Sequence, residues 1–301
     1  MLGNLRKMKV ELADPVKYQL SLNDELVDLN PLLGKPIKLT YTGNIACVHC
    51  GGATKKSFNQ GYCYRCFISL AQCDMCIMKP ETCHYDAGTC REPDWADEFC
   101  FQPHFVYLAN SSGIKVGITR QTQLPTRWID QGAVQALPIL KVQSRFISGL
   151  AEIAIARHVS DKTSWQKMLK NQTAPIDLKA KRDELLKVCD AELAEITKRF
   201  GEQAFELLPD APEVDIVYPV IEYPTKVKSF NLDKQVEVAG TLLGIKGQYL
   251  LLDSGVINIR KFSGYEVEFT GARPEQTSSS TTDNAPQSGN NPESRQRESV
   301  L

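Results

Sequence analysis

The sequence predicts an α+β protein in which a cysteine-rich module lies between β segments and a small three-stranded antiparallel sheet with flanking helices. Three observations support this fold class. Nine of the ten cysteines lie between Cys47 and Cys100. Residues 105–159 show strand and helix patterns in the order hairpin, helix, strand, helix. Runs of β type punctuated by glycine and proline occupy residues 8–45 and 214–269 and predict terminal β segments, the second resembling a small barrel.

The two ends of the chain are predicted as separate β units. In the N-terminal segment, residues 1–45, apolar and polar side chains alternate at 17–22 and at 37–41, as is typical of half-buried strands. A proline-spaced acidic linker leads into a small C-terminal β domain at 209–270. Residues 271–301 are almost entirely polar, and we expect them to be disordered.

Two cysteine pairs begin the module at residues 46–101. Cys47-Val-His-Cys50 and Cys63-Tyr-Arg-Cys66 are CxxC motifs separated by twelve residues. Each motif can turn back on itself and offer two thiolates to the same tetrahedral Zn²⁺. Because four thiolates fill every coordination position, we predict a structural zinc ion and not a catalytic one.

A second zinc ion is predicted on the cysteines that follow. We assign it to four thiols of this second group: Cys73, Cys76, Cys83 and Cys90. Cys100 and His84 stay open as the substitute ligand, since five thiols and one imidazole exceed the needs of one tetrahedral ion. Two ions so close in sequence would supply the folding energy of a module with little apolar core.

Disulfides are the alternative explanation for such cysteine spacing. The chain opens Met1-Leu-Gly-Asn-Leu-Arg-Lys, without the apolar stretch of a secretory signal. We therefore expect reduced thiols and a cytoplasmic location. No apolar run approaches the length of a membrane span, so no membrane partner is expected. The tenth cysteine, Cys189, falls on an apolar helical stripe within a predicted charged helix at 176–208 and is expected to be a small core residue.

The distribution of charge suggests a polyanionic partner. The net charge is −1, but residues 115–182 hold twelve Lys and Arg against four Asp and Glu. Residues 183–223 hold eleven acids and three bases. A basic block beside an acidic one indicates either a nucleic-acid footprint or two surfaces that neutralise each other.

Residues 102–175 form the predicted central domain. Its expected elements are a hairpin, a short helix, a third strand and a longer helix, at residues 105–119, 124–130, 136–143 and 148–159.

Four features of this domain occur in an order that resembles the GIY-YIG nuclease superfamily, in particular a divergent branch. Phe105-Val-Tyr107 stands at the first motif and Lys115-Val-Gly117-Ile-Thr119 at the second, followed by Arg127 and Glu152. The resemblance covers about 60 residues. The fold that it implies is a small three-stranded antiparallel sheet flanked by helices.

The resemblance implies a catalytic role for each of these residues. Tyr107 would help to activate the attacking water, Arg127 would neutralise charge on the phosphoryl oxygens, and Glu152 would hold one divalent ion, Mg²⁺. Lys115 replaces the usual tyrosine of the second motif. It contacts phosphate, or lowers the pKa of Tyr107 because a nearby cation favours the phenolate, or marks a domain that kept the fold and lost cleavage. The structural alternatives are a packed aromatic, a solvated arginine and an acid at a helix edge.

The whole chain also resembles an uncharacterised bacterial family catalogued as a domain of unknown function (DUF2797-like). The shared features are the CxxC pairs, Gly88-Thr-Cys-Arg91, the stretch 126–133 and a C-terminal Gly-Gln-Tyr-Leu. They span most of residues 10–268. This resemblance implies no activity, so function must be inferred from the sites.

Two classes of function fit these observations. The first is a zinc-containing protein that binds DNA or RNA and is either a divalent-metal-dependent phosphodiesterase or a binder without catalysis. We place its nucleic-acid contacts on Arg120, Lys141 and Arg145. The second is a non-enzymatic protein–protein adaptor built on zinc ribbons and a β barrel.

Overall fold

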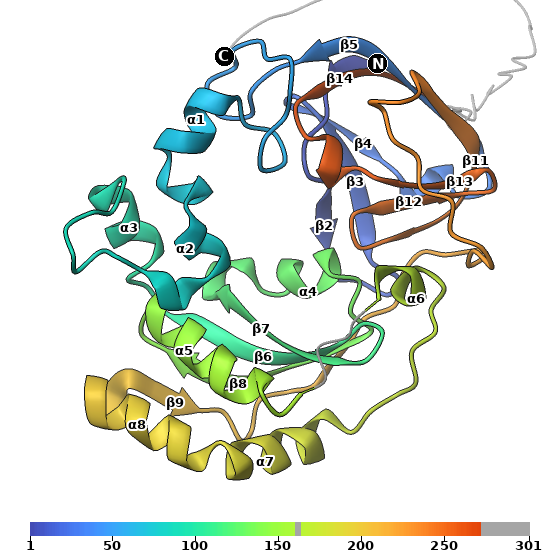
Figure 1. Cartoon of the computed structure of the whole chain (residues 1–301). Coiled ribbons are helices and arrows are strands. Elements are labelled where there is room, and N and C mark those ends of the chain that lie inside the picture. The colour runs from blue at the N-terminus through green and yellow to red at the C-terminus, as the bar shows by residue number, and fades with distance from the viewer. Residues whose placement is uncertain (160–163, 272–301) are drawn as a thin grey trace, which may run out of the picture.

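The largest sheet draws its strands from both ends of the chain. In the computed structural model, which describes residues 1–159 and 164–271, this sheet has six antiparallel strands (Figure 1). In spatial order they are β1 (Leu2–Asn4), β14 (Tyr265–Gly271), β5 (Pro36–Ile45), β11 (Glu237–Lys246), β12 (Tyr249–Leu252) and β13 (Gly255–Asn258). Val267 of β14 lies opposite Gly3 on one side and Tyr41 on the other.

This pairing changes two expectations from the sequence. The N-terminal segment and the C-terminal β domain share one sheet, because β14 inserts between β1 and β5. The predicted barrel is also wrong: over the described residues the strand order runs from β1 to β13 without closing. Two of the C-terminal strands, β11 and β14, complete their hydrogen bonding against β5 of the N-terminal segment instead.

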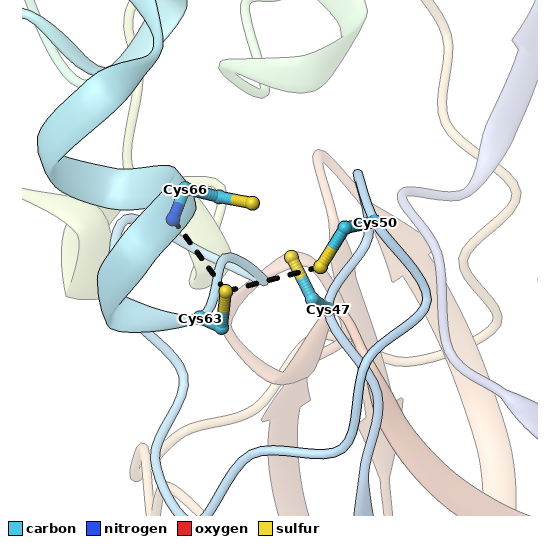
Figure 2. A group of neighbouring side chains, drawn as sticks. All are labelled: Cys47, Cys50, Cys63 and Cys66. Atoms are coloured by element: carbon cyan, nitrogen blue, oxygen red, sulfur yellow. Dashed lines mark hydrogen bonds between the residues drawn. The ribbon is translucent and has the colours of Figure 1, made fainter.

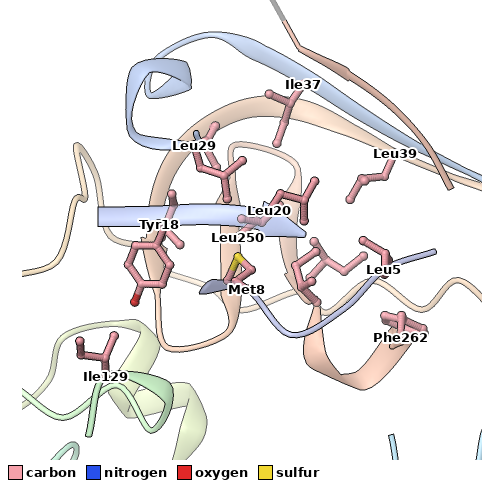
Figure 3. Close-up of a cluster of buried hydrophobic side chains, with 14 of the residues drawn as sticks. Leu5, Met8, Tyr18, Leu20, Leu29, Ile37, Leu39, Ile129, Leu250 and Phe262 are labelled. Atoms are coloured by element: carbon pink, nitrogen blue, oxygen red, sulfur yellow. The ribbon is translucent and has the colours of Figure 1, made fainter. Parts of the chain in front are cut away.

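A three-stranded sheet packs beside the first. It consists of β2 (Lys9–Glu11), β3 (Lys17–Leu22) and β4 (Glu25–Asp28). The predicted alternation in β3 is present, with Tyr18, Leu20 and Leu22 buried. These side chains join Leu5, Leu39 and other residues of the six-stranded sheet in one apolar core (Figure 3).

The cysteine-rich segment contains short helices joined by turns. Its helices are α1 (Tyr64–Ser69), α2 (Met75–Met78) and α3 (Pro93–Phe99), with 3₁₀ turns at Ala71–Cys73 and Pro80–Thr82. Few of its apolar side chains are buried, and half of those are cysteines: Cys47, Cys66, Leu70, Ala71, Cys73 and Ala96. In Figure 1 this segment links the terminal sheets to the central sheet.

The central sheet contains the three predicted strands and two more. Its strands are β6 (His104–Asn110), β7 (Ile114–Arg120), β8 (Gln135–Val142), β9 (Phe205–Leu207) and β10 (Val214–Asp215). β6 lies between β7 and β8, while β9 and β10 extend the sheet by pairing with β8. The two added strands are too short to show an alternating pattern in the sequence. Pro138 lies within β8 next to a register shift, where a missing N–H is tolerated.

The helices of the central region are α4 (Thr126–Asp130), α5 (Arg145–Ala156), α6 (Trp165–Leu169), α7 (Leu178–Val188) and α8 (Asp190–Phe200). α5 starts three residues earlier than predicted, because the Ser144 side chain caps it by accepting a hydrogen bond from the Ile147 N–H at 3.3 Å. The expected charged helix is two helices, α7 and α8. Cys189 lies at their junction and is buried, as predicted.

Two further findings concern the whole chain. No helix among the described residues is long and apolar enough to cross a membrane. The sequence predicts disorder for residues 271–301. From residue 272 onward, these residues lie outside the part of the chain that the structure describes.

The shared sheet predicts that the first residues of the chain stabilise the whole fold. Leu5 is fully buried, whereas Leu2, on the same segment, is 62% exposed. We expect Leu5→Ala to lower the free energy of unfolding by about 2–5 kcal/mol. The matched control Leu2→Ala should change it by less than about 0.5 kcal/mol. Urea unfolding followed by circular dichroism measures both, and equal effects would contradict the shared core.

Candidate metal centre and nucleic-acid interface

The first four cysteines form a compact cluster. The Sγ atoms of Cys47, Cys50, Cys63 and Cys66 all lie within 4.8 Å of one another (Figure 2). The first pair lies in the loop that follows β5, and the second pair lies at the start of α1. Cys63 is the N-cap of α1, and its sulfur accepts a hydrogen bond from the Cys66 N–H at 3.5 Å. The two segments thus present four thiols to one point, as the spacing predicts.

The surroundings of the cluster shift the pKa values of its thiols in opposite directions. Burial opposes ionisation of Cys47, but the backbone N–H groups of Cys50, Cys63 and His49 lower its pKa to about 6. The pKa of Cys66 is raised, first by burial and then by its sulfur neighbours. A bound divalent cation would reverse this repulsion, since it stabilises several thiolates together. The four residues therefore fit a structural zinc ion.

The second cysteine group is arranged differently from the prediction. Cys73 packs with Cys47 and Cys66 of the first cluster. The remaining cysteines of this group line two small adjoining cavities of about 20 Å³ each. Cys76, Cys83, Cys90 and Cys100 line the first cavity, and all of these except Cys90 line the second. Cys73 therefore lies apart from the other three cysteines to which the second zinc ion was assigned.

His84 belongs to a separate polar group. Its Nε2 lies 3.5 Å from Asp74 Oδ1, and its Nδ1 shares a hydrogen bond with Thr89 Oγ1 at 2.8 Å. Asp74 also pairs with Arg91, with 2.6 Å between Oδ2 and Nε. The side chains of Asp74, Cys76 and His84 come within 4.8 Å of one another, so they are a competing candidate for a ligand set.

A cleft lies between the terminal sheets, the cysteine-rich segment and the central sheet. It comprises two cavities of about 740 and 530 Å³. The residues that line both cavities are Lys7, Ile77, Met78, Arg127 and Arg260. Because they share these residues, the two cavities are neighbouring parts of one cleft.

Basic side chains dominate this cleft. Eight of them line it: Arg6, Lys7, Lys9, Lys115, Arg120, Arg127, Arg145 and Arg260. The acids on its wall are Asp74, Asp130 and Glu152. Asp130 pairs with Lys7, and Asp74 pairs with Arg91. The cleft therefore keeps an excess of positive charge, and that excess attracts polyanions.

The residues that resemble the nuclease motifs come together at this cleft. The smaller of the two cavities, of about 530 Å³, is lined by Lys115, Gly117, Arg127 and Glu152. Tyr107 lies beneath them: it is fully buried, and a Cβ at Gly117 would stand 2.6 Å from its hydroxyl oxygen. Arg127 and Glu152 both act electrostatically on this phenol. Residues of two strands and two helices thus lie at this cavity or directly beneath it.

The environment of Tyr107 does not favour a phenolate. Its hydroxyl donates a hydrogen bond to Gln131 Oε1 at 3.0 Å. Burial raises its pKa, and nearby Arg127 partly offsets that rise. The glycine above it is needed to leave room for the ring. Tyr107 is therefore a buried support of the cleft floor.

The three predicted nucleic-acid contacts do not all face the same surface. Arg120 and Arg145 line the cleft. Lys141 lies on another surface, lining a separate cavity together with Glu202 and Glu206. In the second half of the basic block, Arg182 is buried and donates hydrogen bonds to the backbone oxygens at the end of β9, so its charge has a structural use.

Sequence reasoning missed the opposite wall of the cleft. Arg6, Lys7 and Lys9 come from the N-terminus, and Arg260 comes from the 3₁₀ turn Arg260–Phe262 before β14. The closely spaced bases at 6–9 are a visible signal in the sequence. Nothing in the sequence around Arg260 indicates that it meets them.

One known protein family matches most of the segments described above. The model of a family described as protein of unknown function (DUF2797) matches residues 34–267. The chain belongs to this family. Its match includes the whole cysteine-rich segment and the central sheet, which confirms the whole-chain resemblance. Searches of curated proteins and of solved structures give no match. The resemblance to GIY-YIG nucleases stays a prediction.

The first cluster predicts a zinc ion whose loss unfolds its surroundings. Cys63→Ser should lower the zinc content by one equivalent per chain and expose residues 47–70 to proteolysis, because a tetrathiolate site contributes folding energy. His49→Ala is the matched control, since His49 lies within the first knuckle and is exposed. Elemental analysis and limited trypsin digestion measure both effects. Unchanged zinc in Cys63→Ser would contradict the assignment.

Proposed function

We propose that this chain is a zinc-containing protein that binds DNA or RNA in its central basic cleft. The observation that carries this proposal is the convergence of eight basic side chains from segments far apart in the sequence. Arg6 and Arg260 lie on one wall, and Lys115 and Arg145 lie on the other. Such an arrangement fits a chain of phosphates, because each phosphate that meets a cation releases condensed counterions.

Two features of the cleft support binding in preference to internal neutralisation of charge. The carboxylate of Asp130 is 4% exposed and that of Asp74 is 12% exposed, so each has little surface left for an external cation. Arg127 and Arg260 line both cavities and thus lie at the middle of the cleft. Burial lowers the pKa of Arg260, which is therefore held in a setting where an incoming anion is favourable.

A second candidate function is cleavage of the bound phosphodiester. The supporting observation is that Arg127 and Glu152 line the same cavity as Lys115, directly over Tyr107. In this proposal Glu152 provides a carboxylate for Mg²⁺, and Arg127 neutralises charge that develops on the phosphoryl oxygens. Tyr107 would orient these groups through its contacts with Gln131 and Arg127, because its buried hydroxyl is poorly placed to activate water.

Nucleic-acid binding should depend steeply on salt and on the cleft. We expect Lys9→Glu and Arg127→Glu each to weaken the binding of a fluorescent oligonucleotide and to reduce the slope of log K against log salt by about 1. Lys141→Glu is the matched control on the other surface and should leave both quantities unchanged. Fluorescence anisotropy at several salt concentrations measures them.

Other outcomes of this experiment decide between functions. Weakening only in Lys141→Glu would move the footprint to the other surface. If the parent protein fails to bind DNA or RNA even at low salt, the adaptor function becomes the better explanation.

Cleavage, if present, should require Glu152 and a divalent cation. Glu152→Gln keeps the shape of the side chain but removes its charge, and we expect it to reduce Mg²⁺-dependent turnover by about a hundredfold. Affinity should change by less than a few-fold. Gel assays with an end-labelled oligonucleotide, with and without chelator, measure the rate. Turnover that persists in Glu152→Gln, or without divalent metal, would contradict this site.

A further inference from the structure

We propose that Cys76, Cys83, Cys90 and Cys100 bind a second zinc ion, and that this ion fixes Arg145 and the first turn of α5 at the edge of the cleft. The metal site does not depend on nucleic-acid binding. It differs from the ligand set predicted from the sequence in one residue, because Cys100 takes the place of Cys73.

The four cysteine residues line one small space. Cys76 lies in α2, Cys83 follows the turn Pro80–Thr82, and Cys100 ends α3. All four line one cavity of about 20 Å³, and three of them also line its neighbour. A small space lined by four cysteine residues suits one ion that thiolates prefer.

The ligand assignment follows from what the other candidates contact. Cys73 packs against the first cluster and lines neither small cavity. Asp74 already accepts a hydrogen bond from the Cys76 N–H at 3.3 Å and pairs with Arg91. His84 interacts with Asp74 through one ring nitrogen and with Thr89 through the other. The four thiols are thus the better ligand set for zinc.

Arg145 connects this site to the cleft. Its backbone N–H donates to the Cys100 carbonyl oxygen at 2.8 Å, and its guanidinium donates to the carbonyl oxygen of Ile77. Its buried Nε has no hydrogen-bond partner within the described chain. The residue lines the small cavity beside Cys76, Cys83 and Cys100 and also lines the cleft.

Charge balance explains why an arginine stands there. Four thiolates around Zn²⁺ leave two negative charges, which favour cations close to the sulfur atoms. An anionic site would therefore attract the buried guanidinium of Arg145, which lines the same small cavity as Cys76, Cys83 and Cys100.

Backbone packing transmits the position of the ligands to α5. A Cβ at Gly149 of α5 would stand 2.6 Å from Pro80 Cβ, so the helix lies directly against the turn between Cys76 and Cys83. Any side chain at this position would separate them. The metal, by holding the turn, also holds the helix that carries Arg145 and Glu152.

Zinc stoichiometry tests the site itself. Elemental analysis should give two zinc ions per parent chain, one in Cys100→Ser, and two in both Cys73→Ser and His84→Ala. With cobalt in place of zinc, Cys100→Ser should lose about half of the thiolate-to-metal charge-transfer intensity. The proposal is overturned if Cys100→Ser keeps two ions, or if His84→Ala loses one.

The role of Arg145 is tested by measuring how readily a chelator removes the metal. This measurement does not require the metal site to unfold. Arg145→Gln should raise the apparent dissociation constant of one of the two ions about tenfold, as loss of a group that supports metal ligands does. Arg145→Lys keeps the charge and should show a smaller change. Arg157→Gln, beyond the end of α5, should show none. Equal release from Arg145→Gln and Arg157→Gln would remove the link between metal and cleft. Both tests measure metal binding alone. They therefore remain decisive even if none of the variants binds an oligonucleotide.

Discussion

One buried carboxylate holds the two halves of the cleft together. Asp130, at the end of α4, pairs with Lys7 from the N-terminal segment and accepts a hydrogen bond from Gln248 Nε2 at 2.8 Å. Gln248 in turn accepts a hydrogen bond from the backbone N–H of Met8 at 2.8 Å. A charge that is 4% exposed is costly unless it is paired and hydrogen-bonded, so this group tolerates few alternative arrangements. It joins α4, which carries Arg127, to both ends of the chain.

The contacts of Asp130 with Lys7 and Gln248 depend on the six-stranded sheet behind them. Lys7 and Gln248 are brought together because β14 pairs with both β1 and β5, and because β11 and β12 continue the same sheet. Gly247 precedes Gln248 with a φ of +62°, and a Cβ there would stand 3.1 Å from the Asp130 carbonyl oxygen. The backbone of the hairpin can thus approach α4 closely only with glycine at this position. Packing, and not the charge alone, sets the distance between the two walls.

The cysteine-rich segment closes the third side of the cleft by a different physical means. It buries few apolar side chains, and part of the cleft wall comes from Met75, Ile77 and Met78 of this segment. Metal ligation can fix such a segment without a large apolar core. Its position against α5 then decides whether Arg145 faces the cleft. The basic cleft and the cysteine-rich segment are in this way parts of one connected structure.

The local features of the chain can be predicted from its residues. Spacing within Cys47, Cys50, Cys63 and Cys66 was enough to predict their convergence, because each CxxC pair turns back over a few residues. Alternation and helical periodicity predicted β6, β7, β8 and α5, since each signal lies within one element. The burial of Cys189 followed from the same periodicity.

Which distant segments meet depends on how the whole chain packs. Pairing of β14 with β1 joins residues about 260 positions apart, and no local pattern encodes that choice. The same holds for Arg260 opposite Arg127, for Cys100 beside Cys76, and for the separation of Lys141 from the cleft. A charge or a thiol shows in the sequence what it can bind, but its partners depend on how the sheets pack. In this chain the two ends of the sequence fold into one sheet and provide half of the site.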